Sequence, residues 1–346
     1  MKDLGEIVTP LLAWYDENKR ALPWRIDPTP YHVWISEIML QQTRVSAVIA
    51  YYLRFLAQLP NASSLASVSD DRLMKLWQGL GYYRRAKNLK KAAQIIMSDH
   101  DGIFPDSPHE IRKLPGIGEY TAGAIASIAY GFPVPAVDGN VLRIASRLLC
   151  EERSIDAAKT RQDITDLLQE AMPKDRPGDF NQALMDLGAT ICLPKGAPLC
   201  GTCPISSFCL AHRDGKEPNY PIKAPKKPRR IEYRNVYLIL HQNKIALHRR
   251  PKKGLLAGLW ELPNESAEKS SSLRKWGFTG NIPAKGPSHT HIFSHIEWRM
   301  QLFFVEAEGD SLPAKSTWVW AGPEDLRRSY ALPSAFQFFI QPFTES

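Results

Sequence analysis

The sequence predicts a mainly α N-terminal domain followed by a smaller α+β domain. Across residues 1–213, apolar residues recur every three or four positions, as in Val33–Phe55, Leu73–Met97 and Ile164–Met172. This is the period of helices with one buried face. After Ile231, apolar and polar residues alternate in short runs, which is the period of strands. With 346 residues, the chain is long enough for two cores.

A basic, proline-rich segment separates the two parts. Residues 216–230 read KEPNYPIKAPKKPRR and contain four prolines and six basic residues against one acid. Such a composition favours an extended, charged linker. We therefore expect a helical domain over residues 1–215, a linker over 216–231 and an α+β domain over 232–346.

Local signals predict where several helices begin and end. Thr29-Pro30 and Ser107-Pro108 each place a capping residue before a first-turn proline. Gly131 follows an apolar run and marks a helix end. In the C-terminal part, the runs Val236–His241 and Ile245–Arg250 predict a hairpin. The remaining predicted elements are strands at His291–Trp298, Gln301–Glu306 and Thr317–Trp320, and helices at Ser270–Trp276 and Pro323–Arg327.

The charge and the apolar runs narrow the class of protein. A net charge of +8 favours a polyanionic partner, most simply nucleic acid, although many basic proteins bind no anion. No apolar run reaches membrane-spanning length, and no apolar signal segment follows Met1. We therefore expect no membrane partner and reduced cysteines.

Four cysteines lie close together at Cys192, Cys200, Cys203 and Cys209, spaced C-x7-C-x2-C-x5-C. Thiolates this close share a short loop, and a cation makes that arrangement favourable. A disulfide network would need an oxidising compartment. The spacing alone leaves a structural zinc loop and an iron–sulfur cluster equally open.

Leu114–Gly118 reads LPGIG between two helical segments. The proline starts a tight turn, and Gly116 and Gly118 let the backbone approach a ligand closely. The next helix begins near Glu119, so its first amides point toward the hairpin, where a DNA phosphate fits without being read for sequence. An ordinary joint between two helices is the alternative.

Together, this hairpin and the cysteine loop resemble the helix-hairpin-helix DNA glycosylases that carry a [4Fe–4S] cluster, and in detail the adenine-specific members of that family. The resemblance spans almost the whole chain. Besides the cysteine loop, it is carried by the runs Leu22–Arg25, Ser36–Thr43, Gly79–Tyr83, Leu114–Thr121, Val137–Asn140 and Met185–Gly188. The loop between the first two cysteines is one residue longer than the family usually has.

The resemblance implies a function and a cofactor. It implies a monofunctional glycosylase of base excision repair that hydrolyses the N-glycosidic bond of adenine mispaired with 8-oxoguanine or guanine in duplex DNA. A monomer in the bacterial cytoplasm, associated with DNA, is expected. The implied ligands of the [4Fe–4S] cluster are Cys192, Cys200, Cys203 and Cys209. Rival functions are a bifunctional glycosylase/lyase, a Nudix pyrophosphohydrolase with a DNA-binding extension, and a non-catalytic zinc module.

Glu37 has Val33, Trp34, Ile38 and Leu40 within about one helical turn. A carboxyl among such groups keeps its proton because desolvation penalises the charge, which gives a general acid near neutral pH. A solvent-facing glutamate on an amphipathic helix is the alternative. The resemblance implies that Glu37 protonates the imidazole nitrogen of adenine.

Asp138 precedes a helix that starts near Asn140, so it is predicted to be an N-cap. The amides of the helix start favour the ionised carboxylate. By resemblance, Asp138 stabilises the oxocarbenium-like sugar, while Tyr120 and Asn140 support the two carboxyl groups. Related endonuclease III enzymes have a Schiff-base lysine where Tyr120 stands, so the resemblance implies an uncut strand.

The resemblance also assigns DNA contacts. Trp24 and Arg25 match residues of the adenine pocket, with a core tryptophan and a surface arginine as the alternatives. Tyr82 matches a side chain that intercalates beside the damaged base. The other matching positions are the wedge residues Gln41 and Gln42, and Thr43 and Leu80, which contact that base. The basic residues Arg84, Arg85, Lys87, Lys90 and Lys91 either track phosphates or solvate a helix face.

Gly258–Pro263 resembles the strand that enters a Nudix box. The paired glutamates that would hold Mg²⁺ are missing from the sequence of residues 264–277. The resemblance therefore implies a Nudix-like domain that reads 8-oxoguanine. Phe293, Ser294 and His295 match its recognition loop, where a hydroxyl and an imidazole can each donate or accept.

Overall fold

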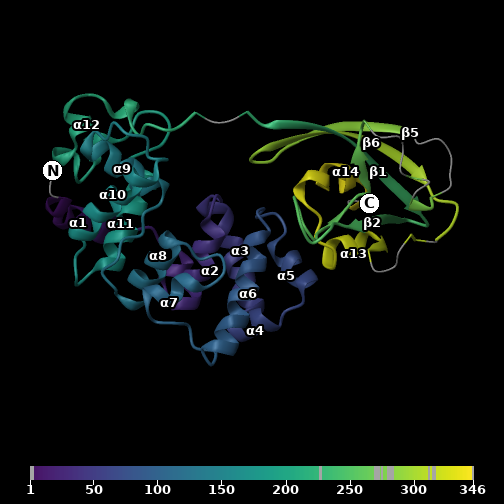
Figure 1. Cartoon of the computed structure of the whole chain (residues 1–346), viewed down its shortest axis with the longest axis horizontal. Coiled ribbons are helices and arrows are strands. Elements are labelled where there is room, and N and C mark those ends of the chain that lie inside the picture. The colour runs from purple at the N-terminus through teal and green to yellow at the C-terminus, as the bar shows by residue number, and fades with distance from the viewer. Residues whose placement is uncertain are drawn as a thin grey trace. The chain divides into compact units, whose positions relative to one another are not determined.

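The computed structural model describes residues 4–225, 228–268, 273, 276–278, 284–310, 312–313 and 317–344. Backbone contacts divide the chain into two units: Met1–Ser67 with Asn88–Pro225, called the helical unit, and Val68–Lys87 with Lys226–Ser346, called the sheet unit. Figure 1 shows the strands of the sheet unit in green to yellow. No described helix has both the length and the apolar composition needed to cross a membrane.

In the helical unit, short helices pack mainly around two central helices, α2 (Pro30–Leu40) and α11 (Pro177–Thr190). Its helices are α1 (Val8–Asn18), α2 (Pro30–Leu40), α3 (Val45–Gln58), α4 (Ala62–Ser67), α7 (Pro108–Lys113), α8 (Glu119–Tyr130), α9 (Gly139–Leu149), α10 (Ala158–Glu170), α11 (Pro177–Thr190) and α12 (Leu210–Arg213), and α6 (Arg84–Asp99) continues into it. The helix α2 packs against α3 and α8, while α11 packs against α1, α8 and α9. One core lies around Leu11, Phe180 and Leu187, and three of the clustered cysteines pack against it.

The predicted helix ends are confirmed. Thr29 Oγ1 accepts from the amide of His32 at the start of α2, and Ser107 Oγ accepts from the amide of Glu110 at the start of α7. Gly131 ends α8 with a left-handed φ of 71°. These caps satisfy amides and carbonyls that a helix leaves without internal partners.

Two predicted helical stretches are interrupted. Val33–Phe55 contains the end of α2 and the start of α3, with a break between residues 40 and 45. Leu73–Met97 contains the end of α5 (Asp70–Trp77) and the start of α6, with a break at residues 78–83. Both breaks fall in the runs to which the resemblance assigns DNA contacts.

The sheet unit is a mixed, seven-stranded sheet. Its strands are β1 (Arg230–His241), β2 (Lys244–Arg249), β3 (Trp260–Glu261), β4 (Asn264–Ser266), β5 (Ala284–Ile292), β6 (Ile296–Glu306) and β7 (Trp318–Ala321), and its C-terminal helices are α13 (Pro323–Arg328) and α14 (Ser334–Thr344). The order β3-β2-β1-β6-β5 contains one parallel pair, β1 with β6, while β4 pairs with β1 and β7 with β2. One core contains Trp298, Leu326 and Phe336, from β6, α13 and α14.

The predicted hairpin is confirmed, and its turn uses Gln242 and Asn243 at φ 45° and 59°, as a type I′ turn requires. The predicted strand His291–Trp298 is wrong. The chain turns at residues 293–295 between β5 and β6, and the amide of Phe293 donates to the carbonyl of Ile296 at 2.8 Å. The predicted helix Ser270–Trp276 lies mostly outside the described residues. The strand β3 falls within Gly258–Pro263, the run that resembles a strand, while α14 and β4 were not predicted.

Candidate active site and cysteine cluster

Glu37 lies in α2 with its carboxyl almost fully buried, the residue being 4% exposed. The hydroxyl of Tyr120 donates to Glu37 Oε2 at 2.5 Å. Burial raises the pKa of Glu37 to about 7; the charge of Asp138 adds to this rise, while the bond from Tyr120 and the charge of Arg25 oppose it. The side chain therefore keeps its proton up to nearly neutral pH, which is what a general acid needs.

Asp138 caps α9, as predicted. Its Oδ1 accepts from the amides of Asn140 and Val141, both at 2.8 Å, and its Oδ2 accepts from Asn140 Nδ2 at 2.8 Å. We expected these amides to keep the pKa low, but burial outweighs them and raises it. Three donors favour the anion of Asp138, whereas the described residues supply Glu37 with one. Asp138 therefore ionises before Glu37.

A buried ion pair holds Arg25 beside this site. Arg25 donates through Nη1 and Nη2 to the two oxygens of Asp186, at 2.8 and 2.9 Å. Arg20 pairs with the same carboxylate at 2.6 Å, and the side chain of Asp186 is 1% exposed. Both Arg25 and Asp138 appear among the charges that shift the pKa of Glu37. Sequence reasoning missed Asp186, although it stands in the quoted run Met185–Gly188.

The structure distinguishes between the two interpretations of Trp24 and Arg25. Trp24 is buried and packs edge-on against Tyr52, with ring centroids 5.4 Å apart. This is the environment of a core tryptophan. Arg25 is not a surface arginine, because its side chain is 13% exposed and anchored by Asp186.

The hairpin has the glycine geometry that close approach requires. Gly116 has φ 87°, and a Cβ built there would lie 2.8 Å from Asn88 Cβ. Gly118 is the N-cap of α8, and both glycines are exposed. The first turn of α8 therefore meets solvent at a glycine-lined edge, where its dipole favours an anion.

Two of the predicted wedge residues have unusual backbones. Gln42 and Tyr82, in different units, have left-handed φ values of 60° and 46°, which are uncommon for residues other than glycine. Gln41 Nε2 lies 3.4 Å from Thr121 Oγ1. Thr43 is half-buried, and Leu80 is buried. Strained backbone of this kind tends to collect at functional sites.

Within the sheet unit, the predicted wedge and recognition loop are in contact. Tyr82 Oη lies 3.0 Å from Ser294 Oγ. The amide of Arg230 donates to the carbonyl of His295 at 3.1 Å, and Phe293 packs edge-on against Trp298. The loop is therefore fixed by backbone and ring contacts at both ends.

Two of the basic residues on α6 donate to backbone carbonyls within the sheet unit. Arg85 Nη2 donates to the carbonyls of Leu80 and Gly81, at 3.0 and 3.2 Å. Lys87 Nζ donates to the carbonyl of Ala257 at 2.6 Å. Both cations therefore hold backbone segments of the sheet unit.

The four clustered cysteines interact electrostatically. The pKa of the Cys203 thiol is raised to about 11, mainly by burial and also by the neighbouring Cys192 and Cys209. Arg147 Nη1 donates to Cys192 Sγ at 3.1 Å. Thiols whose pKa is raised in this way stay protonated unless they bind a metal centre, which displaces the proton. The arginine beside Cys192 is compatible with an anionic, thiolate-ligated centre.

Comparisons with known proteins agree with the fold. Residues 35–170 match the HhH-GPD superfamily base excision DNA repair protein family, and residues 235–341 match the NUDIX domain family. A thermostable thymine-DNA glycosylase superposes with a TM-score of 0.56 at 27% identity, over 60% of this chain and 96% of that one. An endonuclease III structure superposes with a TM-score of 0.53 at 22% identity, over 62% and 99%, and shares the fold. The fold and these matches define a DNA glycosylase of the HhH-GPD superfamily with a C-terminal Nudix-like domain.

The relatives narrow the family further. Adenine DNA glycosylases of Rattus norvegicus and Homo sapiens are 37% and 35% identical to the chain, over 89% and 92% of it and 71% of each relative. The adenine DNA glycosylase of Buchnera aphidicola subsp. Acyrthosiphon pisum is 41% identical, over 83% of the chain and 82% of the relative. The chain belongs to the adenine DNA glycosylase family.

Proposed function

We propose that the chain hydrolyses the N-glycosidic bond of adenine mispaired with 8-oxoguanine or guanine in duplex DNA and leaves an abasic site. The observation that supports this most is the pair of carboxyl groups with different protonation. Glu37 has a pKa near 7, while three hydrogen bonds favour the anion of Asp138. Glycoside hydrolysis needs such a pair, one acid and one anion.

The chemistry follows from this difference. Glu37 gives its proton to the imidazole nitrogen of adenine, so that the base departs neutral. Positive charge then develops on the deoxyribose, and the carboxylate of Asp138 stabilises it. Asn140 orients this carboxylate through its side-chain amide. Water completes the cleavage.

Tyr120 decides what happens to the strand. A lysine at this position would form a Schiff base with the opened sugar and cut the backbone. A phenol cannot form that bond. The hydroxyl instead donates to Glu37, so the product is an intact strand with an abasic site.

Recognition of the opposite base uses residues of the sheet unit. Tyr82 intercalates beside the damaged base, and Ser294 and His295 recognise the donor–acceptor edge of 8-oxoguanine by hydrogen bonding. Phe293 positions this loop by packing on Trp298. The remaining proposed DNA contacts are Arg25, Gln41, Gln42, Thr43 and Leu80, with Gly116 and Gly118 at a phosphate.

Cys192, Cys200, Cys203 and Cys209 would hold a [4Fe–4S] cluster. When bound, the cluster supplies four iron–thiolate bonds that fix the loop. Arg147 offsets part of the negative charge through its bond to Cys192 Sγ. Arg143 holds the same cysteine by donating to its carbonyl at 2.9 Å.

The test uses duplexes that differ only in the base facing adenine. The chain should release adenine opposite 8-oxoguanine and guanine, and alkali should then reveal abasic sites. Glu37→Gln should abolish release while leaving mispair binding intact, because it removes the proton and keeps the shape. Base release by that variant at the wild-type rate would remove the acid role, and a borohydride-trapped enzyme–DNA adduct would favour the lyase.

A second test separates recognition from catalysis. The double variant Ser294→Ala, His295→Ala should lose discrimination between 8-oxoguanine and guanine opposite adenine more than it loses excision rate. Single-turnover rates on the two duplexes give the ratio. An unchanged ratio would mean that this loop does not read the base.

A further inference from the structure

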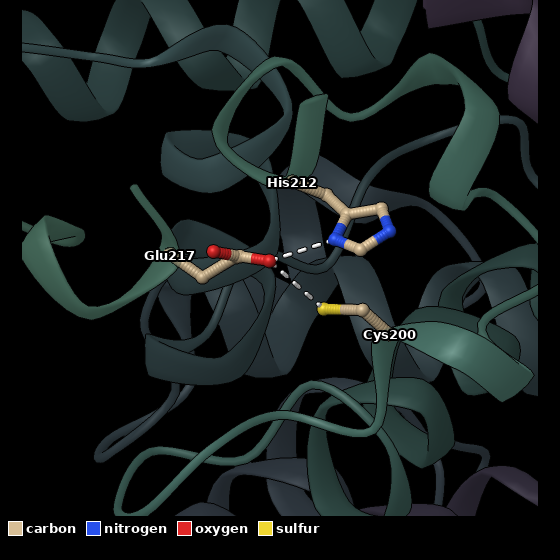
Figure 2. A group of neighbouring side chains, drawn as sticks. All are labelled: Cys200, His212 and Glu217. Carbon is tan, nitrogen blue, oxygen red and sulfur yellow. Dashed lines mark hydrogen bonds and ion pairs between the residues drawn. The ribbon is translucent and has the colours of Figure 1, made fainter. Parts of the chain in front are cut away.

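The side chains of Cys200, His212 and Glu217 point toward one another (Figure 2). His212 Nδ1 lies 2.7 Å from Glu217 Oε1, and Cys200 Sγ lies 3.5 Å from the same oxygen. A sulfur, a nitrogen and an oxygen thus lie within 4.8 Å of one another. Glu217 and Cys200 are half-buried, while the face of His212 is open to solvent.

These three donors form a recognisable ligand set. Zn²⁺ and similar divalent ions bind three protein ligands of the Cys, His and carboxylate types and complete a tetrahedron with water. Sulfur and imidazole select such ions over Mg²⁺ and Ca²⁺. The exposed edge of the site leaves an entry path and room for water, as a metal site requires.

The local fold brings the donors together at small entropic cost. Cys200 begins the short helix η3 (Cys200–Thr202), His212 lies in α12, and Glu217 begins η5 (Glu217–Asn219). Only 17 positions separate Cys200 from Glu217, so closing the loop requires little ordering of the chain. The site is therefore largely formed before a cation arrives.

Cys200 differs in this respect from another cysteine of the loop. Cys192 Sγ accepts from the cation Arg147 at 3.1 Å. Cys200 Sγ faces a carboxylate instead. A thiolate beside a carboxylate is favourable only when a cation lies between them.

We propose that, in the chain without its cluster, Cys200, His212 and Glu217 bind one divalent cation of the Zn²⁺ and Fe²⁺ class, with water as the fourth ligand. While bound, this cation withholds Cys200 from cluster assembly. The inference rests on the donor atoms of the loop and not on glycosylase activity. Its failure would leave the proposed function untouched.

The test uses the full chain stripped of its cluster and Co²⁺ as a spectroscopic probe. One equivalent should give sulfur-to-cobalt charge-transfer and tetrahedral d–d bands. His212→Ala and the nearly isosteric Glu217→Gln should weaken Co²⁺ binding by at least about tenfold. Asp214→Asn removes another carboxylate of the same loop and is the matched control; it should bind as the parent does. Far-UV circular dichroism checks that each variant folds.

A further variant separates this site from a four-cysteine site. Cys192→Ser removes a cysteine of the loop without touching the three donors, so Co²⁺ binding should persist. X-ray absorption of the Zn²⁺-loaded parent should show one sulfur with nitrogen and oxygen neighbours. Four sulfurs around zinc, loss of binding in Cys192→Ser, no binding by the parent, or parent-like binding by both His212→Ala and Glu217→Gln would each overturn the proposal.

Competition with the cluster gives an independent readout. Zn²⁺ added before iron and sulfide should lower the visible absorption of the reconstituted cluster in the parent. Glu217→Gln should relieve this inhibition, because the cation no longer holds Cys200. Equal inhibition of the parent and the variant would contradict competition at this cysteine.

Discussion

The buried carboxyl of Glu37 should make the stability of the chain depend on pH in one direction. Its pKa rises from the ordinary value of 4.5 to about 7 on folding, so the folded state holds the proton more tightly than the unfolded state. The stability that this preference contributes is fully present below pH 4.5 and is lost as the pH rises through 7. Above that pH, the folded chain must carry a buried charge.

The size of the effect follows from the shift. The rise from 4.5 to about 7, at about 1.4 kcal/mol per pH unit, corresponds to ~3 kcal/mol. Glu37→Gln keeps the shape and removes the titration. The variant should therefore gain ~3 kcal/mol over the wild type between pH 4.5 and pH 8.5.

Urea unfolding at several pH values measures this difference directly. Glu170→Gln, an exposed change at the end of α10, is the control and should keep a constant offset from the wild type. Groups that do not interact with Glu37 titrate equally in the variant and the wild type, so their contributions cancel. A difference for Glu37→Gln that stays flat, or that shrinks as the pH rises, would refute the claim that burial controls this carboxyl.

Three further outcomes are expected. Tyr120→Phe removes a bond that lowers the pKa of Glu37, so the alkaline limb of the single-turnover rate should move up by about one to two pH units; an unmoved limb would deny the coupling. Asp186→Asn leaves Arg25 buried without its partner and should cost ~3 kcal/mol or more in urea unfolding, against less than ~1 kcal/mol if the pair is dispensable. Gly116→Ala forces a side chain into φ 87° and should cost more than ~1 kcal/mol and weaken duplex binding by gel shift, whereas unchanged affinity would exclude the hairpin as a phosphate site.

The sequence predicted those parts of the site that depend on local context. The apolar neighbours of Glu37 belong to the same helix, so the burial of this carboxyl can be predicted from one short run of sequence. Asp138 caps the helix that it precedes. Its pKa was expected to be low, because the favourable amides are local while the burial that outweighs them comes from packing across the chain.

The partner of Arg25 lay beyond this reasoning for the same reason. Asp186 stands 161 positions away along the chain, and nothing in the local pattern around either residue specifies the pair. The fold brings α11 to the loop that follows α1, and only then does the carboxylate meet two arginines. Asp186 lies in the run Met185–Gly188, which carries the family resemblance. Its role as the partner of Arg25 could be recognised only from the tertiary structure.

Helix breaks were missed where the apolar pattern continues through a loop. Leu80 and Tyr83 are 6% and 7% exposed, so the segment between α5 and α6 buries apolar residues as a helix would. What ends α5 is the backbone: Gly79 and Gly81 adopt φ 101° and 68°, which no helix contains. Periodicity reports burial, and burial alone does not distinguish a packed loop from a helix.

The break after α2 has a different cause, because it contains no glycine. Gln42 adopts φ 60° although it is not a glycine. The residue types at this position therefore gave no signal that predicts the turn. A left-handed residue at the end of a helix redirects the chain within a single residue. Tyr82, at φ 46°, does the same after α5. The two residues proposed to enter the DNA thus share a left-handed backbone conformation. The surrounding packing must offset the free-energy cost of that conformation.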